Sequence, residues 1–494
     1  MEGRSAGAHR TALRRAAAWP LVVVIAAALA LGPQAGQVRG AGTPSLQITP
    51  AQGSVGDRVQ MTGTGLPPGA QVVFVWGTAA GTYRTKVNPD TILFYGFTYE
   101  LGKALLGRAT ADSQGRVSAS FSVPDDVGGD HQIAAVVNGR EAAGGHFNVI
   151  FSPSMNPTQG PVGTPIVVTV HGMGPPPWNT EALSYDNHYT GFLSAVTTHG
   201  FATARIRAAG AAGPHVIEIN SASNATPYLD AQEGPGFLIR HLSLHRAWTF
   251  TVTGDTAAPP DRVDWPAAGA VAPLPQGSGK ASAALTPTAG PILSRVGLRA
   301  KGLQPRTQAQ VVWATAGPGN RMTGMTPLQN HSLLAGAAGA DGTLTGTFTV
   351  PADLGGRHRI EVIQGGAVAG TVWFEVTPSL VTVSPRRVKA GAQFTVQIKG
   401  IGWTELDNGV AVTYDNAYAG YACGFNSRGD ITIPLIATGG PGVHLIDLYP
   451  MIYQGSGQPP WTYQAPQLTA LEDGPGLALG LPLPIFRLAV VVAP

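Results

Sequence analysis

At 494 residues, of which 44% are hydrophobic and 12% charged, the chain is long enough for several domains and too apolar for a disordered protein. Its formal net charge is +3, from 31 basic and 28 acidic residues, but residues 1–40 contribute five of the arginines and one glutamate. The 26 basic and 27 acidic residues that remain balance, which excludes the basic surplus expected of a protein that binds nucleic acid or acidic lipid. Cys423 is the single cysteine, so an intrachain disulfide framework and a cysteine-based zinc site are excluded as well.

The chain begins with the features of a secretory signal peptide. Four arginines, the last of them Arg15, precede an apolar run from Ala16 to Leu31, and small residues follow it. The run is slightly short for a membrane span, so we expect cleavage after Ala35 or Gly40 in preference to retention as an anchor. No second long apolar run follows, and we predict an extracellular or cell-surface protein with no transmembrane anchor after signal cleavage.

A short phrase with glycine, histidine and isoleucine recurs four times, each time at the end of a block of about one hundred residues. Its histidines are His131, His215, His358 and His444. The first block matches the third and the second matches the fourth, which indicates duplication of a two-module unit. The predicted parts are a signal peptide (1–40), module A1 (44–150), module B1 (151–254), a Pro/Ala/Gly-rich linker (255–281), module A2 (282–377) and module B2 (378–494).

Short alternating strands between glycine and proline turns fill every module. Val59 and Met61 alternate with polar residues in the first module, as Phe394, Val396 and Ile398 do in the last. Apolar residues at every second position place one face of a strand on a core and the other in water. We therefore predict an all-β fold, a tandem array of four immunoglobulin-like β-sandwich domains arranged A-B-A-B after a signal peptide.

The opening of the modules, Pro-x-x-Gly followed by Gly-x-x-Val-x-Val-x-Gly-x-Gly, resembles the IPT/TIG branch of immunoglobulin-like domains. The resemblance recurs through most of residues 44–254 and 282–492, and it departs at 292–295, where the usual glycine before the strand is missing. The resemblance is specific for the fold and says little about the function. Members of the family occur in cell-surface receptors, as accessory modules of extracellular polysaccharide-processing enzymes, and in secreted bacterial proteins.

The four repeated histidines receive a structural interpretation from the same resemblance. The stretch Gly-x-His-x-Ile resembles the one where immunoglobulin-like domains build their tyrosine corner, so we expect these histidines to bond the backbone across the corner. His215 and Glu218 do not form a metal pair, because residues three apart on a strand point to opposite faces. His241 and His245 share a strand face but have no third ligand in sight, so we predict no metal site.

An aromatic residue follows the first glycine turn of each module at nearly constant spacing. A buried aromatic on the corresponding strand is typical of immunoglobulin-like sandwiches. We assign this core position to Trp76, Tyr185, Trp313 and Tyr414.

The motif Tyr-Asp-Asn-x-Tyr-x-Gly-aromatic of the two B modules supplies the candidate binding residues. One interpretation is a rigid Asx turn whose aromatic rings fold back on their own module. The other is a surface for sugars or a Ca²⁺ ion, because aromatic rings stack on pyranose faces while carboxylate and amide oxygens bind hydroxyls or a hard cation. A tryptophan precedes each motif and joins the set. The candidates are Trp178, Asp186, Asn187, Tyr189, Phe192, Trp403, Asp415, Asn416, Tyr418 and Tyr421.

An aromatic-rich segment, residues 83–107, has no close counterpart in module A2. It fits a long hairpin with its own binding tip and equally a satellite core patch.

None of the common catalytic motifs occurs: neither a Gly-x-Ser-x-Gly elbow, nor a His-Glu-x-x-His helix, nor a phosphate-binding glycine loop. We predict a secreted, non-catalytic binding or adhesion protein, bivalent for a polysaccharide through its two B modules. The expected partner is a cell-surface glycan or an envelope protein, and no cofactor is expected, with Ca²⁺ as a weak alternative. The alternatives are a purely structural spacer or envelope component, and an accessory chain of an extracellular enzyme complex.

Overall fold

A computed structural model describes most of the chain after residue 42. The predicted signal peptide lies outside the described residues. No helix in the described part of the chain is long and apolar enough to cross a membrane. The described residues are 43–88, 91–174, 180–223, 225–229, 245–254, 257–267, 273–316, 328–453, 464–481 and 483–494.

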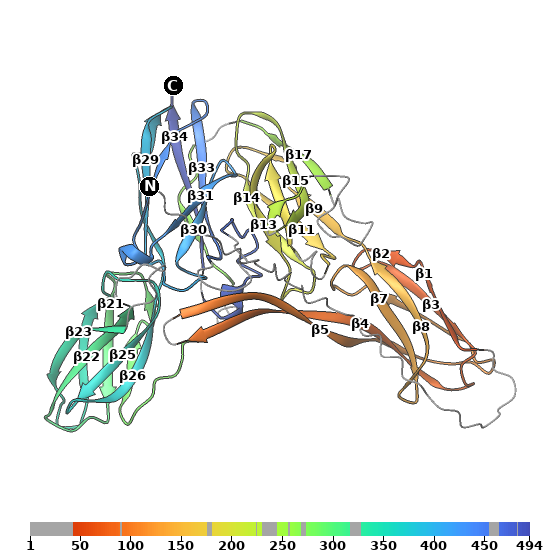
Figure 1. The fold of residues 1–494 in the computed structure, drawn as a ribbon, viewed down its shortest axis with the longest axis horizontal. Helices are drawn as coiled ribbons and strands as arrows, with labels where there is room; N and C mark the ends of the chain where they lie inside the picture. The colour runs from red at the N-terminus through yellow and green to blue at the C-terminus, as the bar shows by residue number, and fades with distance from the viewer. Residues whose placement is uncertain are drawn as a thin grey trace, which may run out of the picture. The chain divides into compact units, whose positions relative to one another are not determined.

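The described residues form an almost wholly β structure, so the all-β prediction is confirmed (Figure 1). The sheets come in pairs, one of three strands and one of five or six, and each pair encloses a buried cluster of apolar side chains. The alternation read from the sequence produces these sheets. Strand β3 (Arg58–Thr64), for example, alternates strictly between exposed and buried residues along its length.

Module A1 packs its core around Trp76, Phe74 and Phe147, which are fully buried. Its long hairpin, β4 with β5, extends well beyond the rest of the sheet (Figure 1). The first sheet has the order β1 (Ser45–Thr49), β3, β6 (Val117–Ser122), and the second has the order β2 (Gln52–Gly53), β8 (Arg140–Val149), β7 (Gly129–Val137), β4 (Gln71–Asn88), β5 (Thr91–Thr110).

Module B1 repeats this plan with a longer connection after its seventh strand. Its three-stranded sheet has the order β14 (Ala202–Arg207), β11 (Pro165–His171), β9 (Ser152–Asn156). The other sheet has the order β10 (Gln159–Gly160), β17 (His245–Val252), β15 (Gly213–Ser223), β12 (Thr180–Tyr185), β13 (His188–Ser194), and β16 (Thr226–Pro227) pairs with β15.

Module A2 has the same strand orders as A1 and a core around Trp313 and Phe374. Its three-stranded sheet has the order β19 (Ser282–Thr286), β21 (Arg295–Lys301), β24 (Leu344–Thr349). The other has the order β20 (Ala289–Gly290), β26 (Ala367–Val376), β25 (Gly356–Gln364), β22 (Gln308–Ala316), β23 (Leu328–Ala337).

Module B2 carries the described helical turns, η2 (Phe425–Ser427) and α1 (Pro475–Ala478). Its three-stranded sheet has the order β27 (Ser379–Ser384), β29 (Gln393–Lys399), β32 (Ile431–Ile436). The other has the order β18 (Arg262–Asp264), β34 (Ile485–Ala493), β33 (Gly442–Pro450), β30 (Gly409–Tyr414), β31 (Ala417–Cys423), and β28 (Arg387–Lys389) pairs with β34.

The predicted linker, residues 255–281, differs from a plain spacer. Its strand β18 adds an edge to the large sheet of B2 by pairing with β34. Asp261 forms an ion pair with Arg386, and Gly279 forms a β-bridge with Gly370 of A2. The sequence did not predict this strand, because three residues are too few to show an alternating pattern.

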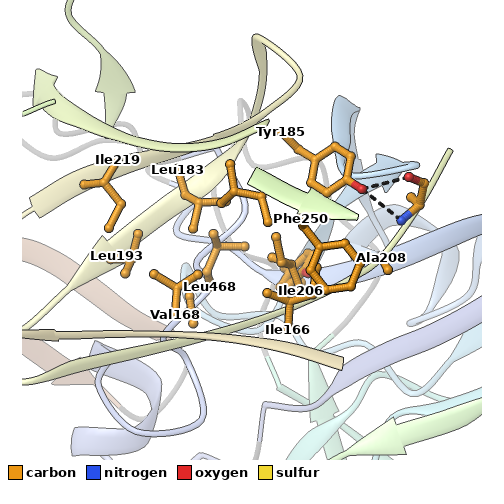
Figure 2. Packing of buried hydrophobic residues seen from close by; sticks show 14 of the residues in the cluster. Ile166, Val168, Leu183, Tyr185, Leu193, Ile206, Ala208, Ile219, Phe250 and Leu468 are labelled. Atoms are coloured by element: carbon orange, nitrogen blue, oxygen red, sulfur yellow. Dashed lines mark hydrogen bonds between the residues drawn. The ribbon is translucent and has the colours of Figure 1, made fainter. Parts of the chain in front are cut away.

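The hydrophobic core of B1 is shared with B2, which also has a core of its own. The buried cluster of B1 continues through Val443, Leu445 and Tyr449 of B2. Leu468, from the connection between β33 and β34, lies among Leu183 and other core residues of B1 (Figure 2). The predicted linker (255–281) therefore does not keep the two B modules apart, because apolar side chains of both are removed from water together.

The hairpin of residues 83–107 also joins more than one module. Tyr83 and Phe94 belong to a buried cluster with Phe192 of B1 and Leu406 of B2. The carboxylate of Glu405 accepts a hydrogen bond from the backbone N–H of Phe94 at 2.7 Å. The segment is thus a hairpin whose aromatic end is buried, which favours the core-patch interpretation over a free binding tip.

Candidate binding site

The Tyr-Asp-Asn motifs form two-residue hairpin turns, one between β12 and β13 and the other between β30 and β31. Asp186 and Asn187 have φ of 49° and 62°, and Asp415 and Asn416 have φ of 49° and 65°. Two successive left-handed residues define the turn type that matches the twist of a hairpin. Aspartate and asparagine adopt this conformation more readily than other residues with a Cβ, which explains why the motif uses them.

Each turn aspartate connects its hairpin to the repeated histidine of the same module. Asp186 accepts hydrogen bonds from Nδ1 of His215 at 2.6 Å and from the backbone N–H of Val216 at 2.8 Å. Asp415 makes the same pair of bonds, at 2.6 and 2.8 Å, to His444 and Leu445. The other ring nitrogen of each histidine lies 2.7 or 2.9 Å from a backbone carbonyl four residues upstream.

The tyrosine of each motif packs on the same histidine. Tyr185 stacks on His215, with ring centroids 5.5 Å apart, and Tyr414 stacks on His444 at the same separation. The hydroxyl of Tyr185 donates to the carbonyl of Ala209 at 2.7 Å and accepts its N–H at 3.2 Å (Figure 2). The two B modules therefore contain the same tyrosine–histidine–aspartate arrangement.

The A modules hold their repeated histidines differently. His131 and His358 stack on Trp76 and Trp313, and both ring nitrogens of each lie within 3.0 Å of backbone carbonyls. The nearby carboxylate, Asp126 in A1, accepts instead from the indole N–H of Trp76 at 2.8 Å. A hairpin-turn carboxylate thus bonds the corner histidine in the B modules alone among the described residues.

The two Tyr-Asp-Asn turns face a common cavity of about 300 Å³. Such a volume lies at the lower end of the range for small-molecule sites. Its walls combine two carboxylates, two tyrosine rings, a histidine and several backbone groups, which suits a polar ligand. The lining residues are Tyr185, Asp186, His188, Ala209, Gly210, Tyr414, Asp415, Ala417, Thr438 and Gly439.

The aromatic residues later in the motifs are not open binding faces. Tyr189 and Tyr418 pack edge to face against each other, with ring centroids 6.1 Å apart. Their hydroxyls donate to the carbonyls of Ala225 and Gln464, respectively. Phe192 is buried, so its prediction as a ligand-binding residue is wrong, since strand β13 lies under the connection from B2.

The remaining candidates lie apart from the cavity. Trp403 is 9% exposed and packs edge to face on His358, so it is a contact between A2 and B2 and is not available to a ligand. Asn416 is buried and donates to the carbonyl of Arg207. Tyr421 is 46% exposed but does not line the cavity. Trp178 lies outside the described residues.

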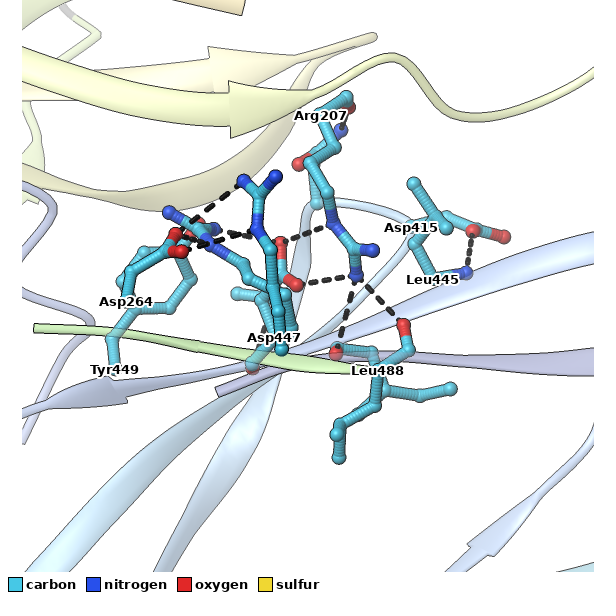
Figure 3. Close-up of polar contacts among 12 residues, drawn as sticks. Arg207, Asp264, Asp415, Leu445, Asp447, Tyr449 and Leu488 are labelled. Atoms are coloured by element: carbon cyan, nitrogen blue, oxygen red, sulfur yellow. Dashed lines mark hydrogen bonds and ion pairs between the residues drawn. The ribbon is translucent and has the colours of Figure 1, made fainter. Parts of the chain in front are cut away.

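A buried ionic cluster beside this site was not predicted. Asp447 pairs with Arg207 of B1 at 2.5 Å and with Arg487 of B2 at 3.0 Å (Figure 3). Arg487 also pairs with Asp264 of β18 at 3.1 Å and bonds the hydroxyl of Tyr449 at 2.7 Å. Arg262, which is about half exposed, also pairs with Asp264 at 3.1 Å, so three arginines share two aspartates. The fully buried members, Asp447, Arg207 and Arg487, are all paired, as buried charges require. Nothing in the sequence signals it, because its members come from separate modules.

Burial and neighbouring polar groups shift the pKa of two corner histidines and of one buried glutamate. Burial lowers the pKa of His215, but the Ala211 carbonyl and the Asp186 carboxylate outweigh it and raise that pKa above its ordinary value. Burial lowers the pKa of His358 more than Asp353 raises it. Burial also raises the pKa of Glu181 well above its usual range, and its Oε2 has no hydrogen-bond partner among the described residues.

No group of three or more metal-ligating side chains that could hold an ion occurs among the described residues. The oxygens of Asp186 and Asp415 already accept hydrogen bonds from histidine and backbone N–H groups. Calcium binding by this chain stays a prediction.

No family model matches the chain, and no curated protein matches it. A mutant alpha-2-macroglobulin of Salmonella matches 92% of this chain with 9% identity and a TM-score of 0.18, and the chain spans 32% of its length. An ectodomain fragment of ICAM-5 matches 91% of this chain and 100% of its own, with 15% identity and a TM-score of 0.18. Invasin, a bacterial integrin-binding protein, matches 83% of this chain and 76% of its own, with 10% identity and a TM-score of 0.19. At these scores the likenesses carry no inference about this chain.

Proposed function

We propose that this chain is an exported, non-catalytic binding protein whose ligand occupies the cavity between the two Tyr-Asp-Asn turns. The observation that carries the proposal is the convergence of both copies of the motif on one cavity. If each Tyr-Asp-Asn turn served only its own hairpin, nothing would require it to line the same cavity as the other copy. The signal-peptide pattern of residues 1–40 supports export, and the proposal includes IPT/TIG-type modules as the scaffold.

The ligand class that fits is a saccharide. Hydroxyl groups donate to carboxylates, and Asp186 and Asp415 provide one from each side of the cavity. The partly exposed ring of Tyr414 supplies apolar contact for the C–H face of a sugar, while Thr438 and backbone groups add polar contacts. His188 lines the cavity on the B1 side where B2 has Ala417, so the walls are unequal and favour one orientation of the ligand.

The geometry changes the expected number of sites. The sequence predicts one weak site in each B module and a gain from avidity. Because the two motifs share one cavity and Tyr189 packs on Tyr418, we propose one composite site per chain. Binding to a repetitive polysaccharide then requires no second site.

Retention on polysaccharides tests the proposal. The mature chain, residues 41–494, is passed over cell-wall and insoluble polysaccharides beside two variants. Ala417→Trp fills the cavity and keeps Asp415, whose carboxylate makes the hydrogen bonds of the turn, and Tyr421→Ala removes an exposed ring outside the cavity. We expect wild type and Tyr421→Ala to be retained and Ala417→Trp to pass through. Equal retention of Ala417→Trp and wild type would overturn the proposed site.

The shared core and the buried ionic cluster favour a second candidate, a rigid structural spacer or envelope component. Such a role needs fixed module positions and no ligand. Passage of the wild-type chain through every matrix, with its fold intact by circular dichroism, would support it.

A further inference from the structure

The corner histidines of the B modules have an acceptor at both ring nitrogens. Nδ1 of His215 faces the carboxylate of Asp186, and Nε2 faces the carbonyl of Ala211. Neither acceptor can donate, and a neutral imidazole has only one N–H. The doubly protonated ring satisfies both contacts, and the carboxylate at Nδ1 favours the charged ring. The corner histidines of the A modules also have an acceptor at each ring nitrogen, but both of these are backbone carbonyls, so the carboxylate distinguishes the B modules.

The carboxylate of this pair is also part of the cavity wall. Asp186 occupies the first position of the hairpin turn, lines the cavity, and accepts the N–H of Val216. His444 and Asp415 repeat every one of these contacts on the opposite side. Each corner histidine therefore fixes the position of one carboxylate that a ligand in the cavity would meet.

We propose that protonation of His215 and His444 holds the two Tyr-Asp-Asn turns in the geometry that forms the cavity, and that loss of these protons releases the turns. The clasp is the His–Asp pair in each B module. This regulation rests on the proposed function for its use, but the clasp itself is testable without any ligand.

Several titratable and charged groups lie around the two His–Asp pairs. Asp186 and Tyr185 face His215, Asp415 and Tyr414 face His444, and His188 lies on the cavity wall of the first turn. The guanidinium groups of Arg207 and Arg487 are paired with Asp447, and Asp264 is shared by Arg487 and the half-exposed Arg262.

The pH window follows from the direction of the shift at His215. Its pKa in the folded chain is raised above the ordinary 6.5, so the clasp is complete below about pH 6.5 and is lost as the pH rises through the raised value. His358 of module A2 gives the opposite case. No turn carboxylate bonds His358, and burial lowers its pKa.

Nuclear magnetic resonance of the mature chain between pH 5 and 9 tests the clasp directly. We expect the imidazole signals of His215 to titrate above pH 6.5 and those of His358 below it. The amide of Val216 is expected to exchange with solvent about ten-fold faster once His215 is neutral, after correction for base catalysis, because a charge-assisted hydrogen bond has been weakened.

Two variants test whether the Asp186 carboxylate sets the protonation of His215. Asp186→Asn retains a residue that tolerates the turn and is expected to lower the pKa of His215 while leaving His444 unchanged. His358→Gln is the control in an A module and is expected to leave the exchange of Val216 unchanged. Titration of His215 at or below pH 6.5, or the same pKa in Asp186→Asn, would overturn the clasp. A clasp that titrates as expected in a chain that no polysaccharide retains would leave the inference standing and remove the proposed function.

Discussion

Replacing Asp447 by alanine is expected to destabilise the unit formed by the two B modules more than any surface substitution. Asp447 is 2% exposed and is the shared partner of Arg207 and Arg487, which are 3% and 1% exposed. Its loss leaves two buried guanidinium groups short of a carboxylate. Removing one partner of a buried ion pair costs about 3–5 kcal/mol. For a unit of about 200 residues this lowers Tm by roughly 6–20 °C.

Differential scanning calorimetry of the mature chain measures this effect. The matched control is Asp430→Ala, which removes a carboxylate paired with Lys399 at 2.9 Å but about 40% exposed. The control is expected to cost less than about 1 kcal/mol. An Asp447→Ala variant that melts within 2 °C of wild type would show that the ionic cluster does not join the modules.

Three further predictions concern single side chains. Glu181→Val, which installs the residue found at the matching position Val410, is expected to raise Tm at pH 8 but not at pH 4, because the penalty of the raised pKa grows by about 1.4 kcal/mol per pH unit above the ordinary 4.5. Trp403→Ala is expected to lower the free energy of unfolding by about 3–5 kcal/mol in urea denaturation, because the ring is buried between modules. Tyr83→Phe is expected to lower it by about 1.5–3 kcal/mol, because Asp473 loses a hydrogen bond of 2.8 Å from the hydroxyl.

Each of these predictions has an outcome that contradicts it. A Glu181→Val variant stabilised equally at both pH values would show that the carboxyl does not carry the penalty. A Trp403→Ala variant with unchanged stability would place the ring in solvent. For Tyr83→Phe, the contradicting result is a stability equal to that of wild type.

The sequence predicts the parts of this molecule that depend on local patterns. Alternation such as Val59 and Met61 sets the strands, and the repeated phrase around His215 marks the corner of each module. The turn residues Asp186 and Asn187 follow from backbone preference alone. These features are readable because each involves residues close in sequence.

The parts that could not be predicted depend on contacts between modules. Tyr189 and Tyr418 are 229 positions apart, and no spacing in the chain says that their rings meet. The same holds for Arg207 with Asp447, and for Trp403, whose indole is covered by a neighbouring module. Of the residues that line the cavity, only Asp186 and Asp415 were predicted to bind a ligand, and they were assigned to two separate surfaces.

Titration calorimetry with an oligosaccharide cut from the retaining polysaccharide tests the central claim that the two Tyr-Asp-Asn turns form one site. We expect one ligand per chain for wild type and no heat of binding for Ala417→Trp. Two ligands per chain, or binding that survives Ala417→Trp, would contradict it and return the two motifs to separate surfaces.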